Sequence, residues 1–313
     1  MRYLTYRKNG SDRPGFGVGE LVVDGARALA TAGMNGNARV AQSTRQILEL
    51  SNEDKTQLGE AAAQCAAAGD GLGLEEVELG PPVPDPEKII GLGLNYPTHA
   101  VEFGGPVPEA PQLFPKFPPS LTGPYGTIEL PAAAPDEVDF EGELAVVIGC
   151  RCRNVPADEA LNYVAGAMAF NDVTARDLQH QTSQWTAGKA IDTFAPCGPA
   201  VVSLDEVGDI GDLRVRTHVN GSLMQDGTTA EMLFDVPNTI AFVSGLMTLV
   251  PGDIIATGTP TGVGFRRDPP VYLGDGDIVE VEVERVGKIT NPVASQAAVT
   301  GRKGTPREAR VPE

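Results

Sequence analysis

The chain has 313 residues, of which 41% are hydrophobic and 21% charged, so it is long enough for one large globular domain or two of unequal size. Its formal net charge of −18 argues against nucleic acids and anionic membranes as partners, because both would repel an acidic protein. Many glycines (37) and prolines (26), with only 5% aromatic residues, favour short strands and turns rather than a helical bundle.

Neither an export signal nor a membrane span is evident in the sequence. The first seven residues, Met-Arg-Tyr-Leu-Thr-Tyr-Arg, contain no apolar signal core, and no apolar run approaches the length of a membrane span. We therefore expect a cytoplasmic protein that does not associate with membranes. The four cysteines lack zinc-finger spacing and are expected to be buried thiols: Cys65, Cys150, Cys152 and Cys197.

Residues 1–78 are predicted to form a small N-terminal α+β domain. Short strands near Tyr3–Tyr6 and Gly17–Val23 precede helices near Val40–Leu50 and Asp54–Ala68, and the second helix is alanine-rich. Residues 79–87 contain four prolines and can continue neither a strand nor a helix, so they are predicted to be a linker.

Strand patterns dominate from residue 88 onward, which predicts an α+β, mainly β chain with a second domain at 88–294 and a mobile tail at 295–313. Helices are expected only near 157–163, 174–181 and 237–248. The predicted strands of this domain are Ile89–Leu94, Thr127–Leu130, Glu141–Ile148, Val164–Phe170, Ala200–Ser203, Leu213–Val219, Asp253–Gly258 and Ile278–Glu284.

Two glutamates one residue apart, Glu141 and Glu143, precede an apolar β-branched run. Strand side chains alternate faces, so the two carboxylates point the same way, about 7 Å apart along the strand. Poorly solvated carboxylates at that spacing repel, and a divalent cation such as Mg²⁺, Mn²⁺ or Ca²⁺ would relieve the cost. The alternative is a solvent-facing stripe, which Val279-Glu-Val-Glu-Val-Glu284 resembles.

The segment Phe170-Asn-Asp-Val-Thr-Ala-Arg-Asp-Leu-Gln179 follows another predicted strand. Asp172 lies where that strand ends, so it is either a third metal ligand or a helix cap. Arg176 and Gln179 are three residues apart on one helical face, where they could hold a substrate carboxylate or be surface polar residues.

Three further segments carry candidate catalytic or binding groups. Lys189 lies in a loop bounded by Gly and Pro, where it is either an oxyanion-stabilising group or a surface lysine. His99 and Glu102 are three residues apart after a strand, as either an acid–base pair or a surface ion pair. Gly258 and Thr259 lie in a Gly- and Thr-rich loop that suits a substrate carboxylate, unless it is only a tight turn.

Taken together and in this order, six segments resemble the motifs of the fumarylacetoacetate hydrolase family, over about residues 88–293. They are Gly-Leu-Asn-Tyr-x-x-His-x-x-Glu (93–102), Phe-x-Lys (114–116), Glu-x-Glu-Leu-Ala-Val-Val-Ile-Gly (141–149), Asn-Asp-Val-Thr-Ala-Arg-Asp-x-Gln (171–179), Gly-Lys-x-x-Asp-Thr-Phe-Ala-Pro (188–196) and Thr-Gly-Thr-Pro-x-Gly-Val-Gly (257–264). The chain looks like the acylpyruvate hydrolases and 2-hydroxyhepta-2,4-diene-1,7-dioate isomerases of that family.

The resemblance implies a mixed β-sandwich roll with few helices, preceded by a small N-terminal domain and assembled as a homodimer. The apolar segment Ile240–Val250 is a candidate for the dimer interface. The resemblance also implies roles for the candidate residues. Mg²⁺ would be bound by Glu141, Glu143 and Asp172; His99 and Glu102 would activate water from a mobile lid, with Lys189 stabilising the substrate oxygen; Arg176, Gln179, Gly258 and Thr259 would hold the substrate.

The function we expect from this set is metal-dependent hydrolysis of a carbon–carbon bond in an acylpyruvate-like 2,4-dioxo acid, as in the catabolism of aromatic compounds. The alternative is decarboxylation or tautomerisation of a 2-oxo acid, such as oxaloacetate or a 2-hydroxy-dienedioate, through an enolate held by the metal. A third hypothesis is a catalytically silent protein that binds a metabolite.

Overall fold

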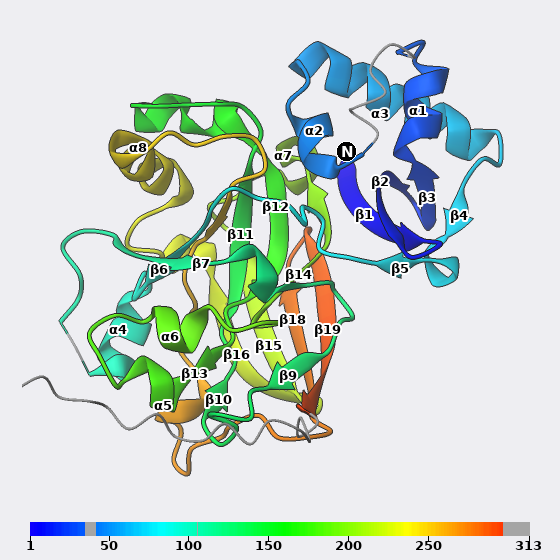
Figure 1. The fold of residues 1–313 in the computed structure, drawn as a ribbon. Helices are drawn as coiled ribbons and strands as arrows, with labels where there is room; N and C mark the ends of the chain where they lie inside the picture. Colours follow the sequence, from blue (N-terminus) through cyan, green and yellow to red (C-terminus); the bar gives the residue numbers. More distant parts are fainter. Residues whose placement is uncertain (35–41, 105, 297–313) are drawn as a thin grey trace, which may run out of the picture.

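A computed structural model describes residues 1–34, 42–104 and 106–296 of the protein. A large mixed sheet packs against a five-stranded sheet, and three short helices, at residues 97–103, 176–179 and 186–189, lie together beside the sheets (Figure 1). This is the strand-rich α+β sandwich that the sequence predicts. Among the described helices, none combines the length and the apolar character needed to cross a membrane.

The large sheet has 12 strands. Ten follow one another in the order β4 (Leu72–Gly73), β3 (Leu21–Asp24), β2 (Ser11–Val18), β1 (Arg2–Lys8), β14 (Ala195–Val202), β12 (Val164–Asn171), β11 (Gly142–Ile148), β17 (Ile254–Ala256), β6 (Ile89–Gly93) and β7 (Gln112–Lys116). The other two are β5 (Glu78–Leu79), paired with β1, and β8 (Leu121–Thr122), paired with β14. Because β1 pairs with β14, the N-terminal strands continue the sheet of the second predicted domain. The boundaries 1–78, 79–87 and 88–294 stay a prediction.

The five-stranded sheet has the order β16 (Ser222–Thr228), β15 (Arg214–Val219), β18 (Ile278–Val283), β19 (Gly287–Ser295) and β9 (Ile128–Leu130). A separate pair joins β10 (Val138–Asp139) to β13 (Thr174–Ala175). The α-helices are α1 (Gly25–Thr31), α2 (Thr44–Leu48), α3 (Asn52–Ala67), α4 (Pro97–Phe103), α5 (Arg176–Gln179), α6 (Thr186–Lys189), α7 (Leu204–Val207) and α8 (Val236–Leu246). Short 3₁₀ turns are η2 (Leu74–Glu76), η3 (Pro118–Ser120), η4 (Ala157–Tyr163), η5 (Thr229–Glu231) and η6 (Gly264–Arg266).

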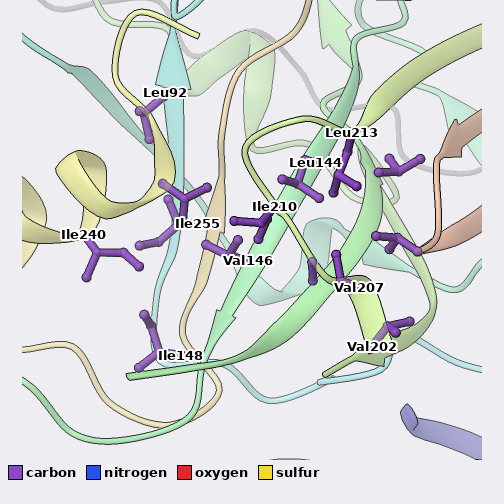
Figure 2. Packing of buried hydrophobic residues seen from close by; sticks show 14 of the residues in the cluster. Leu92, Leu144, Val146, Ile148, Val202, Val207, Ile210, Leu213, Ile240 and Ile255 are labelled. Atoms are coloured by element: carbon purple, nitrogen blue, oxygen red, sulfur yellow. The ribbon is translucent and has the colours of Figure 1, made fainter. Parts of the chain in front are cut away.

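Strand β11 is buried on both faces, which explains its uninterrupted apolar sequence. Leu144, Val146 and Ile148 point into the core that contains α8 and both sheets (Figure 2). Ala145 and Val147 point into a second core, to which the N-terminal helices contribute. Glu143 and Glu141 precede Ala145 by two and four positions. Since side chains alternate along a strand, both are directed away from the core between the two sheets.

Several predicted boundaries are wrong, for local reasons. The segment Gly17–Val23 is interrupted by a turn between β2 and β3, where Gly19 has a φ of 58°. The segment 174–181 begins as a strand, because Thr174 and Ala175 pair with β10, and its helix is only four residues long. The predicted helix 157–163 is a 3₁₀ turn. Strands β4, β5, β7, β8, β10, β16 and β19 and helices α1, α6 and α7 lie outside the predicted elements.

Two sequence expectations fall partly outside the described residues. The helix expected at Val40–Leu50 corresponds to α2, which begins at Thr44, while residues 35–41 are not described. The tail expected at 295–313 begins at the last residue of β19, and residues 297–313 are not described. The Ile240–Val250 segment contributes Ile240, Val243 and Leu249 to the protein's own core, while Leu246 is exposed. Its role in a dimer interface stays a prediction.

Gly166 in β12 provides a test of the packing between β12 and β14. A Cβ atom there would lie 2.1 Å from the backbone oxygen of Val202, so we expect Gly166→Ala to lower the free energy of unfolding by about 1–3 kcal/mol or more. Gly245 in α8 is the matched control, because a Cβ atom there meets no atom within 4 Å. Gly245→Ala is expected to be neutral or stabilising by at most about 1 kcal/mol. Equal destabilisation of the two variants in chemical denaturation would contradict this packing.

Candidate metal centre and active site

Three carboxylates converge where β11 begins and β12 ends. These strands are paired in register at Gly142 and Asn171, so Glu141 and Asp172 lie next to each other just beyond that pair. Glu143 follows on the same strand as Gly142. One oxygen atom from each of Glu141, Glu143 and Asp172 lies within 4.8 Å of the other two. The structure thus brings together the three residues that the sequence suggested as metal ligands.

These three carboxylates are shielded from solvent, and two of them, Glu141 and Asp172, are held by buried cations. The exposed fractions are 5% for Glu141, 1% for Glu143 and 0% for Asp172, which excludes a solvent-facing stripe. The Lys189 Nζ atom donates to Glu141 Oε2 at 2.6 Å and to Asp172 Oδ2 at 2.7 Å. A second ammonium, that of Lys116, donates to Asp172 Oδ1 at 2.6 Å. Asp172 is therefore not a helix cap, and Lys189, the last residue of α6, is not on the surface.

Arg176 completes the cation set around Glu141. Its Nη2 atom lies 2.7 Å from Glu141 Oε1 and 2.8 Å from Asp139 Oδ2. Its Nη1 atom donates to Gln179 Oε1 at 2.9 Å. Arg176 and Gln179 are 1% and 2% exposed, so they are not surface polar residues. Asp139, which the sequence did not single out, orients the guanidinium from the neighbouring strand β10.

The balance of charge in this cluster leaves Glu143 without a cation. Four carboxylates (Asp139, Glu141, Glu143 and Asp172) face three cations (Lys116, Arg176 and Lys189), and Glu143 Oε2 accepts a hydrogen bond from Gly258 N at 2.9 Å. Burial raises the pKa of Glu143 well above its usual value, and the negative charges of Asp172 and Glu141 raise it further.

The pKa of Glu141 moves in the opposite direction. Burial alone would raise it, but Lys189 and Arg176 outweigh burial and lower the pKa below its usual value. Glu143 is therefore the carboxyl group whose ionised form is least compensated, so its protonated form is favoured when no cation is bound. A divalent cation with oxygen ligands fits this donor set, since it would favour the ionised form of Glu143 at the point where the three carboxylates meet.

His99 and Glu102 lie on α4, which follows β6 and begins with Pro97 in its first turn. His99 Nδ1 lies 3.0 Å from Glu102 Oε2, and Glu102 Oε1 accepts a hydrogen bond from Gly262 N at 3.0 Å. Burial on its own raises the pKa of Glu102, but the hydrogen bonds from His99 and Gly262 leave that pKa below its usual value. His99 is only 4% exposed, so the pair is not a surface ion pair.

The loop after β17 reaches the carboxylates through its backbone. Gly258 has a φ of 95°, a conformation that L side chains rarely adopt, and this turns its amide toward Glu143. Thr259 Oγ1 donates to the Gly142 carbonyl at 2.9 Å and accepts from Gln225 Nε2 at 2.7 Å. Gln225, in the unpredicted strand β16, is a buried support that no local sequence signal identified.

A small cavity of about 10 Å³ joins the two halves of the site. His99, Glu141, Arg176, Gln179, Lys189 and Thr259 line it together with aromatic residues. The rings of Phe114 and Trp185 are 5.7 Å apart, and those of Phe103 and Trp185 are 6.3 Å apart. A larger cavity of about 700 Å³ is lined by residues of β1, β2 and α3 and contains none of the candidate site residues.

Sequence reasoning gave Lys116 no role of its own, although it lies within the Phe-x-Lys segment of the family resemblance. Strand β7, whose last residue is Lys116, contains Pro115 and was not predicted, because proline is disfavoured inside strands. The burial of the Lys116 side chain against Asp172 becomes apparent only once β6 and β7 are paired. The same applies to Asp139, whose partner Arg176 is 37 residues away.

The fold and the site define a class of metal-binding enzymes, and comparison with known proteins identifies the family. The family profile "Fumarylacetoacetate (FAA) hydrolase C-terminal" matches residues 88–294. Oxaloacetate tautomerase fahd2, mitochondrial, of Xenopus laevis is 43% identical over 244 residues, which cover 76% of this chain and 76% of that protein. The chain therefore belongs to the fumarylacetoacetate hydrolase family, as its motifs indicated.

Two solved structures are similar along most of the chain. Maleylpyruvate hydrolase from Sphingobium sp. SYK-6, in complex with manganese(II) and pyruvate, is 32% identical with a TM-score of 0.75, covering 95% of this chain and 100% of that one. The 2-hydroxyhepta-2,4-diene-1,7-dioate isomerase from Mycobacterium marinum is 32% identical with a TM-score of 0.70, covering 95% and 99% of the two chains. Two relatives with the same 32% identity to this chain are thus named after different reactions, one as a hydrolase and one as an isomerase.

Replacing Glu143 with glutamine separates metal binding from folding. Glu143→Gln removes a carboxylate that the cation would bind, so we expect affinity for Mn²⁺ or Mg²⁺ to fall by about 100-fold or more, as measured by isothermal titration calorimetry. The metal-free variant is expected to be at least as stable as the metal-free parent, because a neutral amide replaces a carboxyl group whose ionised form is disfavoured by burial.

The control is Glu282→Gln, which removes an exposed glutamate from β18 and is expected to change neither quantity. Unchanged metal affinity in Glu143→Gln, or equal loss in both variants, would contradict the assignment of the metal centre.

Proposed function

We propose that this protein is a divalent-metal-dependent tautomerase that interconverts the keto and enol forms of a 2-oxo acid such as oxaloacetate. The observation that carries the proposal is the hydrogen bond between His99 and Glu102, because His99 lines the same cavity as Glu141 of the carboxylate cluster. Proton transfer on a bound oxo acid needs an acid–base group and an electrophilic centre, and needs no added water. The tautomerase name of the Xenopus relative, at 43% identity, supports this reaction over hydrolysis.

Glu141, Glu143 and Asp172 would hold the metal, with Mg²⁺ or Mn²⁺ as the candidates. When bound there, a divalent cation supplies electrostatic stabilisation of the negative charge that develops on the 2-oxo oxygen. Lys189 donates a hydrogen bond to the same oxygen and adds a second positive charge in a water-poor cavity. Arg176, Gln179 and Thr259, which line the cavity, orient the substrate carboxylate. The single N–H of Gly258 is already donated to Glu143, so the substrate contact predicted for Gly258 is replaced by a role in holding that carboxylate.

The proton is carried by His99. Its Nδ1 atom is engaged by Glu102, which leaves Nε2 to take a proton from C3 of the keto form. Glu102 has a lowered pKa and stays ionised at neutral pH, so it stabilises the imidazolium that results. Return of this proton to the oxygen at C2 completes the enol, and the reverse sequence restores the ketone. No atom is gained or lost.

Hydrolysis of an acylpyruvate remains the second candidate, because the same pair could activate a water and a relative of 32% identity is named a maleylpyruvate hydrolase. The predicted homodimer and the predicted cytoplasmic location are also proposals. The proposed cytoplasmic location differs from that of the Xenopus relative, whose name describes it as mitochondrial.

Catalysis is tested with His99→Asn and Glu102→Gln, assayed with Mg²⁺ on the enol form of oxaloacetate. Each substitution is expected to lower kcat by about 100-fold or more, because the acid–base group is lost. Neither contributes a predicted metal ligand, so both variants are expected to retain Mn²⁺ affinity in calorimetry.

Product analysis separates the candidate reactions. Tautomerisation leaves total oxaloacetate constant, decarboxylation releases carbon dioxide, and hydrolysis of an acylpyruvate releases pyruvate. Full activity of His99→Asn on the enol would overturn the assigned proton carrier. Pyruvate release from an acylpyruvate without enol turnover would favour the hydrolase instead.

A further inference from the structure

The site cannot receive a substrate in the arrangement described above. The cavity of about 10 Å³ is close to the minimum volume for one water molecule, whereas an oxo acid is several times larger. One wall of this cavity is formed by residues of α4, including His99 and Phe103. Part of the cavity wall must therefore move to admit a substrate, and α4 is the part that carries His99.

Helix α4 is weakly anchored by its own packing. Of its seven residues, only His99 and Ala100 are buried, and Val101 is 70% exposed. Elements with so little buried surface open at low free-energy cost. Specific contacts from outside the helix must then determine how much of the time it stays closed.

Arg266 makes such a contact at the end of α4. Its Nη2 atom donates a hydrogen bond to the carbonyl of Phe103, the last residue of the helix. A guanidinium is favourable there, because the last carbonyls of a helix lack backbone partners and carry partial negative charge. Gly104 ends the helix with a φ of 88°, and a Cβ atom at Gly104 would lie 3.6 Å from Arg266 Nη2.

The same guanidinium also contacts two aromatic rings. The Arg266 Cζ atom lies 5.5 Å from the ring centroid of Phe103 and 4.8 Å from that of Phe265, and the two rings are 5.6 Å apart. Within the described residues Arg266 forms no ion pair, so no carboxylate competes for it. Its side chain is exposed and is not part of the cavity lining.

Phe103 links this contact to the catalytic groups. Its ring lies 6.3 Å from the ring of His99 and 6.3 Å from that of Trp185 across the cavity. We propose that Arg266 is a positioning residue, which holds α4 closed through Phe103 and so keeps the His99–Glu102 pair against the substrate. Only the effect of Arg266 on kcat rests on the proposed function, because closure of α4 can be measured without turnover.

Trp185 provides a direct readout, since it is the sole tryptophan in the 313-residue chain and lies against Phe103. In the substrate-free protein, we expect Arg266→Met to raise the acrylamide quenching constant of Trp185 at least twofold. Hydrogen exchange in the peptide containing residues 97–103 is expected to accelerate about tenfold. Arg266→Lys keeps the charge but loses the planar fork, so its values are expected to lie between those of Arg266→Met and the parent.

The matched control is Arg151→Met, which removes another exposed arginine, at the far end of β11, and is expected to match the parent in both measurements. With enol oxaloacetate, Arg266→Met is expected to lower kcat about tenfold while Mn²⁺ affinity is unchanged. Parental quenching and exchange in Arg266→Met would overturn the proposal. If the parent itself has no tautomerase activity, the proposed function fails, whereas quenching and exchange still decide the role of Arg266.

Discussion

The site depends on negative charge that the protein buries and does not fully neutralise. Four carboxylates and three cations share a region with almost no solvent, and the imbalance falls on Glu143. Burying an ion costs several kcal/mol unless another charge compensates for it. A chain that keeps such a residue in a strand buried on both faces accepts a loss of stability. The loss is understandable if a cation occupies the site in the working protein.

The fold fixes this cluster through strand register. Because Gly142 pairs with Asn171, Glu141 and Asp172 meet at the edge of the β11–β12 pair. A shift of one residue would exchange the faces of both strands and direct the carboxylates into an apolar core. The cores on the two sides of β11 therefore stabilise the protein and also specify where the ligands are placed.

One loop connects the carboxylate cluster with helix α4. At its start, the Gly258 amide binds Glu143; in its middle, the Gly262 amide binds Glu102; at its end, Arg266 binds the carbonyl of Phe103. The loop at Gly258 and Thr259, predicted to hold a substrate carboxylate or to be only a tight turn, is thus one part of a longer connection.

The sequence alone was sufficient to predict those residue pairs of the site that depend on local backbone geometry. The Glu-x-Glu spacing in a strand and the His-x-x-Glu spacing in a helix each place two groups together with no knowledge of the fold, and the family motifs linked these pairs. Contacts between distant segments were not predictable in this way. Arg176 is held by Asp139, and Lys116 by Asp172, across 37 and 56 residues. Helix formation at Thr174 was overridden by pairing with β10, which only the tertiary structure creates.

The central claim is most directly tested by diffraction from crystals soaked in Mn²⁺, using the anomalous signal of the metal. The account predicts one strong peak about 2.1 Å from an oxygen of each of Glu141, Glu143 and Asp172, with the Lys189 ammonium displaced from its bridging position. A peak bound by other residues, or none at saturating Mn²⁺, would contradict it.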